Sequence, residues 1–502
     1  MIEILLNDRA YEQDIRELLM AFYPGETFVY EPEKGAAFSV EGLVDRQRKE
    51  FSLKIISQDR QEWAEFPADA GEELEKELEE ELSRIQEPIA VDYGNRAQTK
   101  SRIKRRLYVL LVLRTGRLLP WGTLTGIRPT KIVMTKLDEG LSEAETARYM
   151  KKTYYTSDEK IRLALKTAVH ERELLKPMDR DRGYSLYIGI PFCPTTCLYC
   201  SFTSYPIGSW KDRTGLYLEA LFAEMRAAAG MMRGRTLDSV YIGGGTPTSL
   251  TAQDLDRLLS ALEDIFQVSR ARELTVEAGR PDSITREKLE ALINHHVTRI
   301  SINPQTMQQR TLDLIGRRHT TDRVKECFHM ARDMGFDNIN MDLIVGLPEE
   351  GLEDVRDTME QIRFLDPDSV TVHSLAIKRA ARLNTMKEVY KDLKIVGTQE
   401  MIDLTARYAA AMGMEPYYLY RQKNMAGNFE NVGYAREGKA CLYNVAIMEE
   451  QQTIVACGAG TTTKALYRAE NRIERAENVK DVSQYIERIG EMIERKRVLL
   501  ED

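Results

Sequence analysis

Between residues 185 and 373 the chain alternates short apolar segments with longer amphipathic ones. The apolar segments are rich in Val, Ile, Leu and Tyr and have the length and composition of β-strands. The stretches between them, such as 215–232 and 251–266, place apolar residues at helical spacing and predict helices. The expected strands are 185–190, 238–242, 273–277, 298–302, 338–345 and 369–373.

This alternation predicts a parallel sheet with helices outside it, which is an α/β fold. Six strand–helix units are fewer than the eight that close a complete barrel, so we expect a partial (β/α)6, TIM-like barrel. In such barrels the chemistry lies at the C-terminal ends of the strands.

The N-terminal third follows a different pattern. Ser142 with Glu145, and Thr156 with Glu159, have the spacing of capping boxes and predict two helix starts. Segments 1–6, 35–44 and 51–56 predict strands, the last two as a hairpin, while 71–87 and 102–113 predict helices. We therefore expect an N-terminal α+β domain of unknown role at 1–175, a core at 180–380, and a C-terminal extension at 381–502.

Charge and composition restrict the possible functions. The 502-residue chain has a net charge of −8 and lacks the basic stripe typical of nucleic-acid binding. The start lacks a signal-peptide pattern, and the longest apolar run, 107–113, is too short to span a membrane. We therefore expect a cytoplasmic monomer. Thiols stay reduced in that compartment, so clustered cysteines indicate metal binding or catalysis rather than disulfides.

Three of the six cysteines lie within eight residues, directly after the first expected strand. They are Cys193, Cys197 and Cys200, in "YIGIPFCPTTCLYCSF". A zinc site needs a fourth protein ligand or a water, and no Cys or His lies between Cys200 and His295. An iron–sulfur cube fits better, because three thiolates leave its fourth iron open to another ligand. Zinc binding or three unrelated thiols remain the alternatives.

This cysteine motif resembles the signature of radical S-adenosylmethionine (SAM) enzymes. The preceding "IPFC" and the downstream "YIGGGTPTSL" resemble the coproporphyrinogen III oxidase-like branch, which includes anaerobic coproporphyrinogen dehydrogenases and haem chaperones. The long N-terminal region and "WGTLTGIRPTKI", 121–132, are similar to the longer HemZ subgroup. The resemblance implies a [4Fe-4S] cluster held by the three cysteines, one or two SAM molecules, and a radical SAM core at 180–380. It also implies a porphyrinogen substrate and a small electron donor such as flavodoxin or ferredoxin.

Several other residues match SAM-contacting positions of this family. Residue chemistry supports some of them: Glu277 ends a strand, Asp342 interrupts an apolar one, and Arg317 can pair with a carboxylate. Arg318 is the alternative to Arg317. The turn "GGGTP" would let a backbone approach a ligand closely. The full set that the resemblance implies is Tyr187, Tyr199, Gly244, Gly245, Thr246, Glu277, Gln305, Arg317, Asp342 and Ala376.

Two positions depart from the patterns of the subgroups. Phe202 stands where anaerobic dehydrogenases have a fourth cysteine, and Tyr443 stands in place of a chaperone histidine. The expected function is oxygen-independent conversion of coproporphyrinogen III to protoporphyrinogen IX. A haem-binding carrier and another radical SAM reaction are the alternatives. Segment 415–434 is either a packed aromatic loop or a lid that covers the substrate, with Arg421 and Lys423 meeting propionates. Cys327, Cys441 and Cys457 are expected to be core thiols.

Overall fold

The structure is a computed structural model in which the chain forms two compact units. It describes residues 1–57, 65–67, 70–126, 128–378, 380–386, 388–421, 429–470 and 472–501. The first unit comprises residues 1–168 and 419–430, and the second comprises residues 169–418 and 431–502.

The first unit contains a five-stranded sheet with the order β2-β1-β3-β4-β5. The predicted hairpin is confirmed as the antiparallel pair β3–β4. Helix α3 buries its apolar half, 107–113, in the core of the unit, which also contains Phe22 and Phe51. The strands are β1 (Ile2–Leu6), β2 (Phe28–Val29), β3 (Phe38–Asp45), β4 (Glu50–Ile56) and β5 (Ile89–Ala90). The helices are α1 (Glu12–Phe22), α2 (Glu72–Ser83), α3 (Arg96–Thr115), α4 (Pro129–Asp138), α5 (Glu143–Tyr154) and α6 (Asp158–Leu175), whose last residues belong to the second unit.

One of the two predicted capping boxes is confirmed and the other is wrong. Ser142 and Glu145 exchange both hydrogen bonds at the start of α5. At the start of α6 the capping hydroxyl belongs to Ser157, which accepts from the Lys160 amide at 3.3 Å. The Thr156 hydroxyl is buried and makes no hydrogen bond among the described residues. Two adjacent hydroxyl residues left the register of the cap ambiguous in the sequence.

A short segment of the C-terminal region, 419–430, belongs to the first unit. The buried carboxylate of Glu430 accepts hydrogen bonds from Trp121 Nε1 and Lys160 Nζ, both at 2.7 Å. Arg421 is 2% exposed, donates to the Leu124 carbonyl at 2.7 Å, and lies over the Trp121 ring. The expectation that Arg421 meets a substrate carboxylate is therefore wrong, because its guanidinium is enclosed by protein. Lys423, the other residue of that expectation, lies outside the described residues.

The second unit is built on an eleven-stranded sheet with the order β14-β15-β13-β12-β11-β10-β9-β6-β16-β17-β18. Neighbouring strands from β16 through β6 to β13 pair in parallel. The six predicted strands are confirmed as β6 (Gly183–Ile190), β9 (Thr236–Gly244), β10 (Glu273–Glu277), β11 (Arg299–Ser301), β12 (Ile339–Val345) and β13 (Ser369–Ser374). The predicted fold class, α/β with an open parallel barrel-like sheet, is confirmed.

The C-terminal region extends this sheet at both edges, which the sequence pattern did not indicate. Two strands lie beyond β13 and three lie beyond β6, and only β16 among them pairs in parallel with the central strands. They are β14 (Glu415–Tyr420), β15 (Asn431–Ala435), β16 (Thr453–Cys457), β17 (Thr462–Tyr467) and β18 (Arg472–Glu477).

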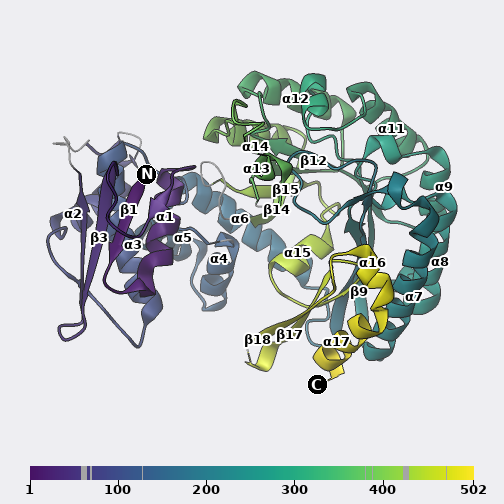
Figure 1. Cartoon of the computed structure of the whole chain (residues 1–502), viewed down its shortest axis with the longest axis horizontal. Coiled ribbons are helices and arrows are strands. Elements are labelled where there is room, and N and C mark those ends of the chain that lie inside the picture. Colours follow the sequence, from purple (N-terminus) through teal and green to yellow (C-terminus); the bar gives the residue numbers. More distant parts are fainter. Residues whose placement is uncertain are drawn as a thin grey trace. The chain divides into compact units, whose positions relative to one another are not determined.

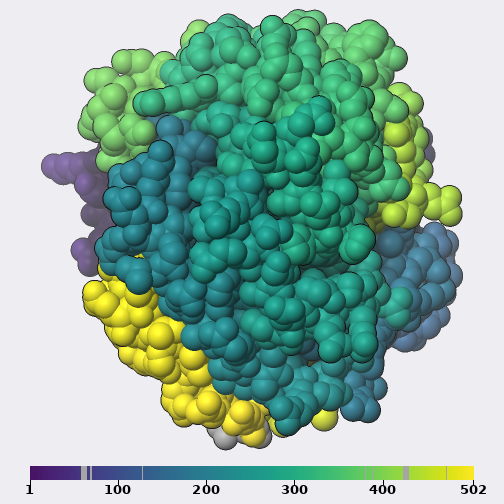
Figure 2. All heavy atoms as spheres, turned by 90° about the vertical axis from the view of Figure 1, so that its right-hand side faces the viewer, coloured from purple at the N-terminus to yellow at the C-terminus, as the bar shows by residue number. Residues whose placement is uncertain are grey.

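Helices of the second unit cover the outer face of the sheet. From α7 to α12 they follow one another round that face in sequence order (Figure 1), and Figure 2 shows this covered face with α17, in yellow, beside α7. Among the described residues, none of the helices has the length and apolar character needed to span a membrane. The helices are α7 (Thr214–Met231), α8 (Ala252–Phe266), α9 (Arg286–Asn294), α10 (Gln309–Leu314), α11 (Thr321–Asp333), α12 (Leu352–Leu365), α13 (Arg382–Thr385), α14 (Gln399–Ala411), α15 (Leu442–Met448), α16 (Val482–Glu487) and α17 (Ile489–Glu501).

The central strands place polar side chains on one face of the sheet and apolar ones on the other. Hydrogen bonds between side chains of neighbouring strands, such as Ser239 to Ser185 and Asn340 to Ser301, show that these residues share a face. The residues next to these along each strand, such as Val240 and Ile300, point to the opposite face and are fully buried and apolar. Since the helices cover the apolar face, the inner face is the polar one, and it can bind a charged ligand.

Candidate active site

The three cysteines lie on a loop at the C-terminal end of β6. Cys193 ends the short strand β7 (Phe192–Cys193), which pairs with β8 (Tyr205–Pro206). Cys197 and Cys200 follow in a turn closed by the Cys200 amide, which donates to the Cys197 carbonyl at 3.2 Å. The Leu198 amide donates to the Ile315 carbonyl at 2.9 Å, so the loop is also bonded to the segment after α10. The sequence therefore folds this loop into a defined cradle at the expected end of the sheet.

The three thiols form a donor set that fits an iron–sulfur cube with one open iron. Burial, together with the neighbouring Cys200 and Cys197 and against the hydrogen bond from Thr246, raises the pKa of Cys193 to about 11, so a positively charged group would favour the ionised form of this thiol. Each thiolate of a cube binds a different iron, so three thiols on one loop are a donor set that can hold three irons and leave the fourth open.

The glycine turn after β9 packs directly against the cysteine loop. The Gly245 and Thr246 amides donate to the Ile190 and Phe192 carbonyls, both at 2.7 Å. A Cβ on Gly245 would lie 2.5 Å from the Phe192 carbonyl oxygen and 3.0 Å from the Cys193 sulfur. Gly244 has a positive φ of 108°, which favours glycine. The turn needs glycine to let the loop approach, and the Thr246 hydroxyl lies 3.5 Å from the Cys193 sulfur.

Glu277 lies at the end of β10, on the polar face. The Tyr241 hydroxyl donates to its carboxylate at 2.6 Å. Burial raises the pKa of Glu277 to about 7, the hydrogen bond from Tyr241 opposes this, and the charge of Asp342 adds to it. The rings of Tyr241, Tyr187 and Tyr443 all contact one another, with centroid distances of 6.1 Å from Tyr241 to Tyr187, 4.8 Å from Tyr241 to Tyr443 and 6.0 Å from Tyr187 to Tyr443. This aromatic cluster holds the Tyr241 hydroxyl against a carboxyl group that titrates near neutral pH.

The stability of Glu277→Gln relative to that of the wild-type protein is expected to increase as the pH rises. Because the folded-state pKa is raised, the native state binds the extra proton and the stability due to this group is lost as pH increases towards about 7. Between about pH 5 and about pH 8 the difference in free energy of unfolding should change by about 2–3 kcal/mol in favour of Glu277→Gln. Urea unfolding at both pH values measures it, with the exposed Glu353→Gln as the control. A difference that does not vary with pH contradicts the raised pKa.

Asp342, Asn303 and Gln305 form a second polar group beside Glu277. Burial would raise the pKa of Asp342, but the neighbouring His373, whose Nε2 lies 3.9 Å from the carboxylate, and a hydrogen bond from Asn340 hold it below its ordinary value. The Asp342 amide donates to the Asn303 side chain at 3.2 Å, and the Gln305 amide donates to the Asp342 carbonyl at 3.0 Å. Gln305 has a φ of 70°, is 8% exposed, and its Oε1 has no hydrogen-bond partner among the described residues. A strained backbone and an unpaired buried acceptor together are typical of a ligand site.

Arg317 connects this polar group to the cysteine loop. Its guanidinium donates to the Asn303 carbonyl, and its Nε has no partner among the described residues. Burial would lower the pKa of Arg317, but interactions with Tyr199 and the Cys197 thiol raise it. Arg318 is exposed, so Arg317 is the arginine that faces the site.

The structure thus brings together most of the residues predicted from the sequence. Contacts lead from Cys197 through Arg317 and Asn303 to Asp342, whose charge acts on Glu277. The other predicted residues contact members of this chain of residues or their neighbours. Tyr199 interacts with Arg317, the Tyr187 ring packs on Tyr241, and the glycine turn packs against Cys193. Ala376 is half-buried, two residues beyond β13.

Sequence reasoning missed Tyr241, Asn303 and Arg280. Tyr241 lies two residues before Gly243, so the alternation of a strand places both on the polar face, and this signal could have identified it. Arg280 donates from Nη1 to the Cys197 sulfur at 3.5 Å. A lone arginine before a proline carries no comparable signal.

The three thiols that were predicted to be core residues are all buried, as expected: Cys327, Cys441 and Cys457.

The comparisons with known proteins give the family of the chain. Residues 187–362 match the Radical SAM superfamily model. The chain is 40% identical over 438 residues to the Bacillus subtilis oxygen-independent coproporphyrinogen-III oxidase-like protein HemZ, covering 86% of this chain and 87% of HemZ. It is 37% identical to the B. subtilis haem chaperone HemW, over 39% of this chain and 51% of HemW. The fold is similar to that of coproporphyrinogen III oxidase HemN from Escherichia coli, with a TM-score of 0.51, 23% identity, and coverage of 65% of this chain and 73% of HemN.

The fold and the three-thiol loop define a radical SAM protein. More narrowly, the chain belongs to the oxygen-independent coproporphyrinogen-III oxidase-like family of that superfamily, because the match to HemZ extends over most of both chains. Membership in the superfamily implies a [4Fe-4S] cluster and SAM.

Proposed function

We propose that this protein is an anaerobic coproporphyrinogen III dehydrogenase, which converts two propionate side chains to vinyl groups and gives protoporphyrinogen IX. The observation that carries the proposal is the polar group next to the thiols, in which Gln305 Oε1 and Arg317 Nε are buried without partners among the described residues. Such a group suits a nucleoside that carries an amino-acid group, as SAM does, and SAM is what the proposed reaction needs.

When bound, the cluster and SAM supply one-electron chemistry that removes a hydrogen atom from the β-carbon of a propionate. In our proposal Cys193, Cys197 and Cys200 hold the cluster, and Arg317 donates to the carboxylate of SAM. Glu277 and Asp342 accept from its ammonium and ribose hydroxyl groups. The carboxylate of each propionate would then leave as carbon dioxide, its two remaining carbons would become the vinyl group, and one electron would pass to an external one-electron acceptor. The protein's own task is to orient both molecules and exclude water.

The surface beside the cysteine loop suits a flat macrocycle that carries carboxylates. Phe202, two residues after Cys200, is 69% exposed, and Lys378 Nζ lies 5.5 Å from the centre of its ring. Ile377, next to Lys378, is 38% exposed. An aromatic face, an aliphatic side chain and a cation at one place can contact a tetrapyrrole ring and one of its propionates.

Anaerobic incubation with SAM, coproporphyrinogen III and a reductant tests the proposal. Chromatography of the oxidised tetrapyrroles should show mono- and divinyl products, and their formation should require the Cys193 thiol. Dithionite can serve first, followed by flavodoxin or ferredoxin, the class of donor that we propose. Cleavage of SAM is measured in the same samples. If SAM is cleaved and no vinyl group forms, the substrate assignment is wrong and another radical SAM reaction replaces it.

A haem carrier is the second candidate, favoured by the 37% identity to HemW and by Phe202, which stands where the dehydrogenases of the family have a cysteine. The chain spans about half of HemW, so this similarity concerns the core alone. Titration with haem, followed by absorbance, distinguishes the two functions. Stoichiometric micromolar binding without any vinyl product would favour the carrier.

A further inference from the structure

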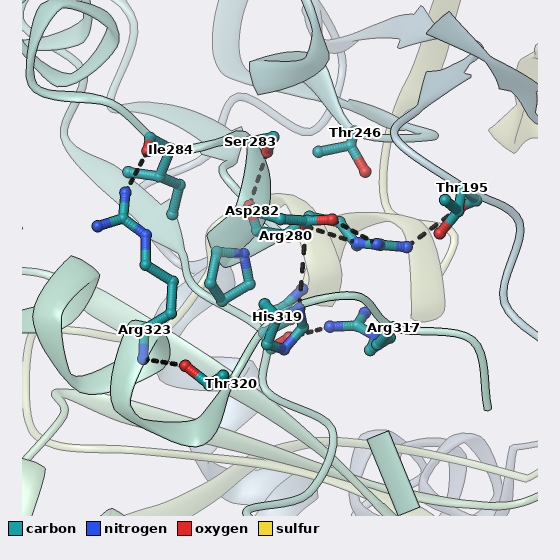
Figure 3. A network of polar contacts seen from close by, with 12 residues as sticks. Thr195, Thr246, Arg280, Asp282, Ser283, Ile284, Arg317, His319, Thr320 and Arg323 are labelled. Carbon is teal, nitrogen blue, oxygen red and sulfur yellow. Dashed lines mark hydrogen bonds and ion pairs between the residues drawn. The ribbon is translucent and has the colours of Figure 1, made fainter. Parts of the chain in front are cut away.

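Arg280 reaches the cysteine loop from the segment after β10 and is 3% exposed. Its Nη1 donates to the Thr195 carbonyl at 3.1 Å and to the Cys197 sulfur at 3.5 Å. Figure 3 shows the guanidinium extending towards Thr195, with Asp282 and His319 on its other side. One buried cation therefore contacts both the backbone of the loop and a cluster thiol.

The position of this guanidinium is fixed from its other side. Asp282 accepts from Nε at 2.9 Å and from Nη2 at 2.6 Å, which is a two-point pair that sets the plane of the guanidinium. The Arg280 carbonyl accepts from the Ser283 hydroxyl at 2.7 Å, so the backbone is held as well. His319 Nδ1 lies 3.8 Å from Asp282, and the buried histidine packs against the pair. A side chain anchored in this way cannot follow the loop if the loop moves.

A hydrogen bond to a cluster thiolate stabilises negative charge on its sulfur. The reduced cluster carries one more electron than the oxidised one, so such a bond favours reduction and raises the reduction potential. We propose that Arg280 is a positioning residue that holds the cysteine loop in place and raises the potential of the bound cluster, and that Asp282 fixes the guanidinium and offsets part of its charge. This inference concerns the cluster alone and does not depend on the tetrapyrrole substrate.

Redox titration of the reconstituted protein, followed by the electron paramagnetic resonance of the reduced cluster, tests the proposal without any turnover. Arg280→Gln should favour the oxidised cluster by about tenfold, which lowers the potential by about 59 mV for one electron. Asp282→Asn should shift the potential in the opposite direction, because it removes a negative charge and leaves the cation. Arg323 lies in the same region and donates to the Ile284 carbonyl at 2.8 Å, so Arg323→Gln is the matched control and should leave the potential unchanged.

The outcomes separate tuning of the cluster from simple damage to the fold. Equal potentials in Arg280→Gln and wild type, at equal iron content, would overturn the proposal, as would shifts of the same sign in the Arg280 and Asp282 variants. If Arg280→Gln binds no cluster, Arg280→Lys decides. It keeps the charge but cannot make the paired contacts, so we expect a potential below that of wild type. A lysine variant with the wild-type potential and signal would show that the paired contacts have no effect.

Discussion

Cys193→Ala is expected to abolish cluster binding and, with it, cleavage of SAM. A cube held by three thiolates loses a third of its protein ligands, and the remaining two cannot hold it against loss to solution. Iron content after anaerobic reconstitution should fall from about four atoms per chain to well below one, since each cube carries about four irons. Iron and sulfide analysis measures this directly, and the charge-transfer absorbance of the cluster gives a second readout.

Cys327→Ala is the matched control for this experiment. Cys327 is another thiol of the same unit, buried in α11, where its sulfur lies 3.5 Å from the Pro281 carbonyl oxygen. It packs in the core and lies outside the cysteine loop, so the variant should keep its iron even if it is less stable. Iron content of the Cys193 variant equal to that of wild type would remove this thiol from the ligand set. Zinc in place of iron in the wild-type protein would restore the single-ion alternative.

The strands, the helices and the cysteine loop could be predicted because each depends on a local pattern. Segments such as 273–277 are short, apolar and flanked by helical stretches, and their type does not depend on distant residues. The cysteine motif could also be predicted, because three ligands within eight residues lie close together on any compact loop. The polar face of the sheet was also encoded, because Asp342 and Glu277 stand at positions that alternate with apolar ones.

What could not be predicted depends on pairing between distant parts of the chain. β16 is a five-residue apolar segment whose strand partner, β6, lies more than 260 residues earlier, as the bond between Ser185 and Gln452 illustrates. Nothing in the segment itself specifies that partner. The same holds for Arg280, whose role appears only when the loop of Cys197 lies beside it. Local pattern gives the type of an element, and packing decides which residues meet.

The C-terminal helix shows how such distant packing is stabilised. Glu224 of α7 is fully buried, and Lys496 of α17 pairs with it at 2.5 Å. The same carboxylate accepts from the Gly458 amide and from Asn478 Nδ2, both at 2.7 Å, and from the Tyr485 hydroxyl. One buried anion thus connects four segments of the second unit. Every oxygen of the carboxylate is used, so the charge is tolerated only while its partners are present.

Lys496→Ala is therefore expected to destabilise the second unit by about 3–5 kcal/mol, because it leaves the Glu224 carboxylate buried without its cation. Urea unfolding measures the loss. Arg497→Ala is the matched control on the next residue of the same helix: its pair with Glu494, at 2.9 Å, is half-exposed on both sides, so its removal should cost less than about 1 kcal/mol. Lys496→Met combined with Glu224→Gln removes both charges and should recover part of the loss. If Lys496→Ala costs no more than Arg497→Ala, the buried pair does not hold the C-terminal helix on α7, and apolar contacts such as those of Met492 must do so instead.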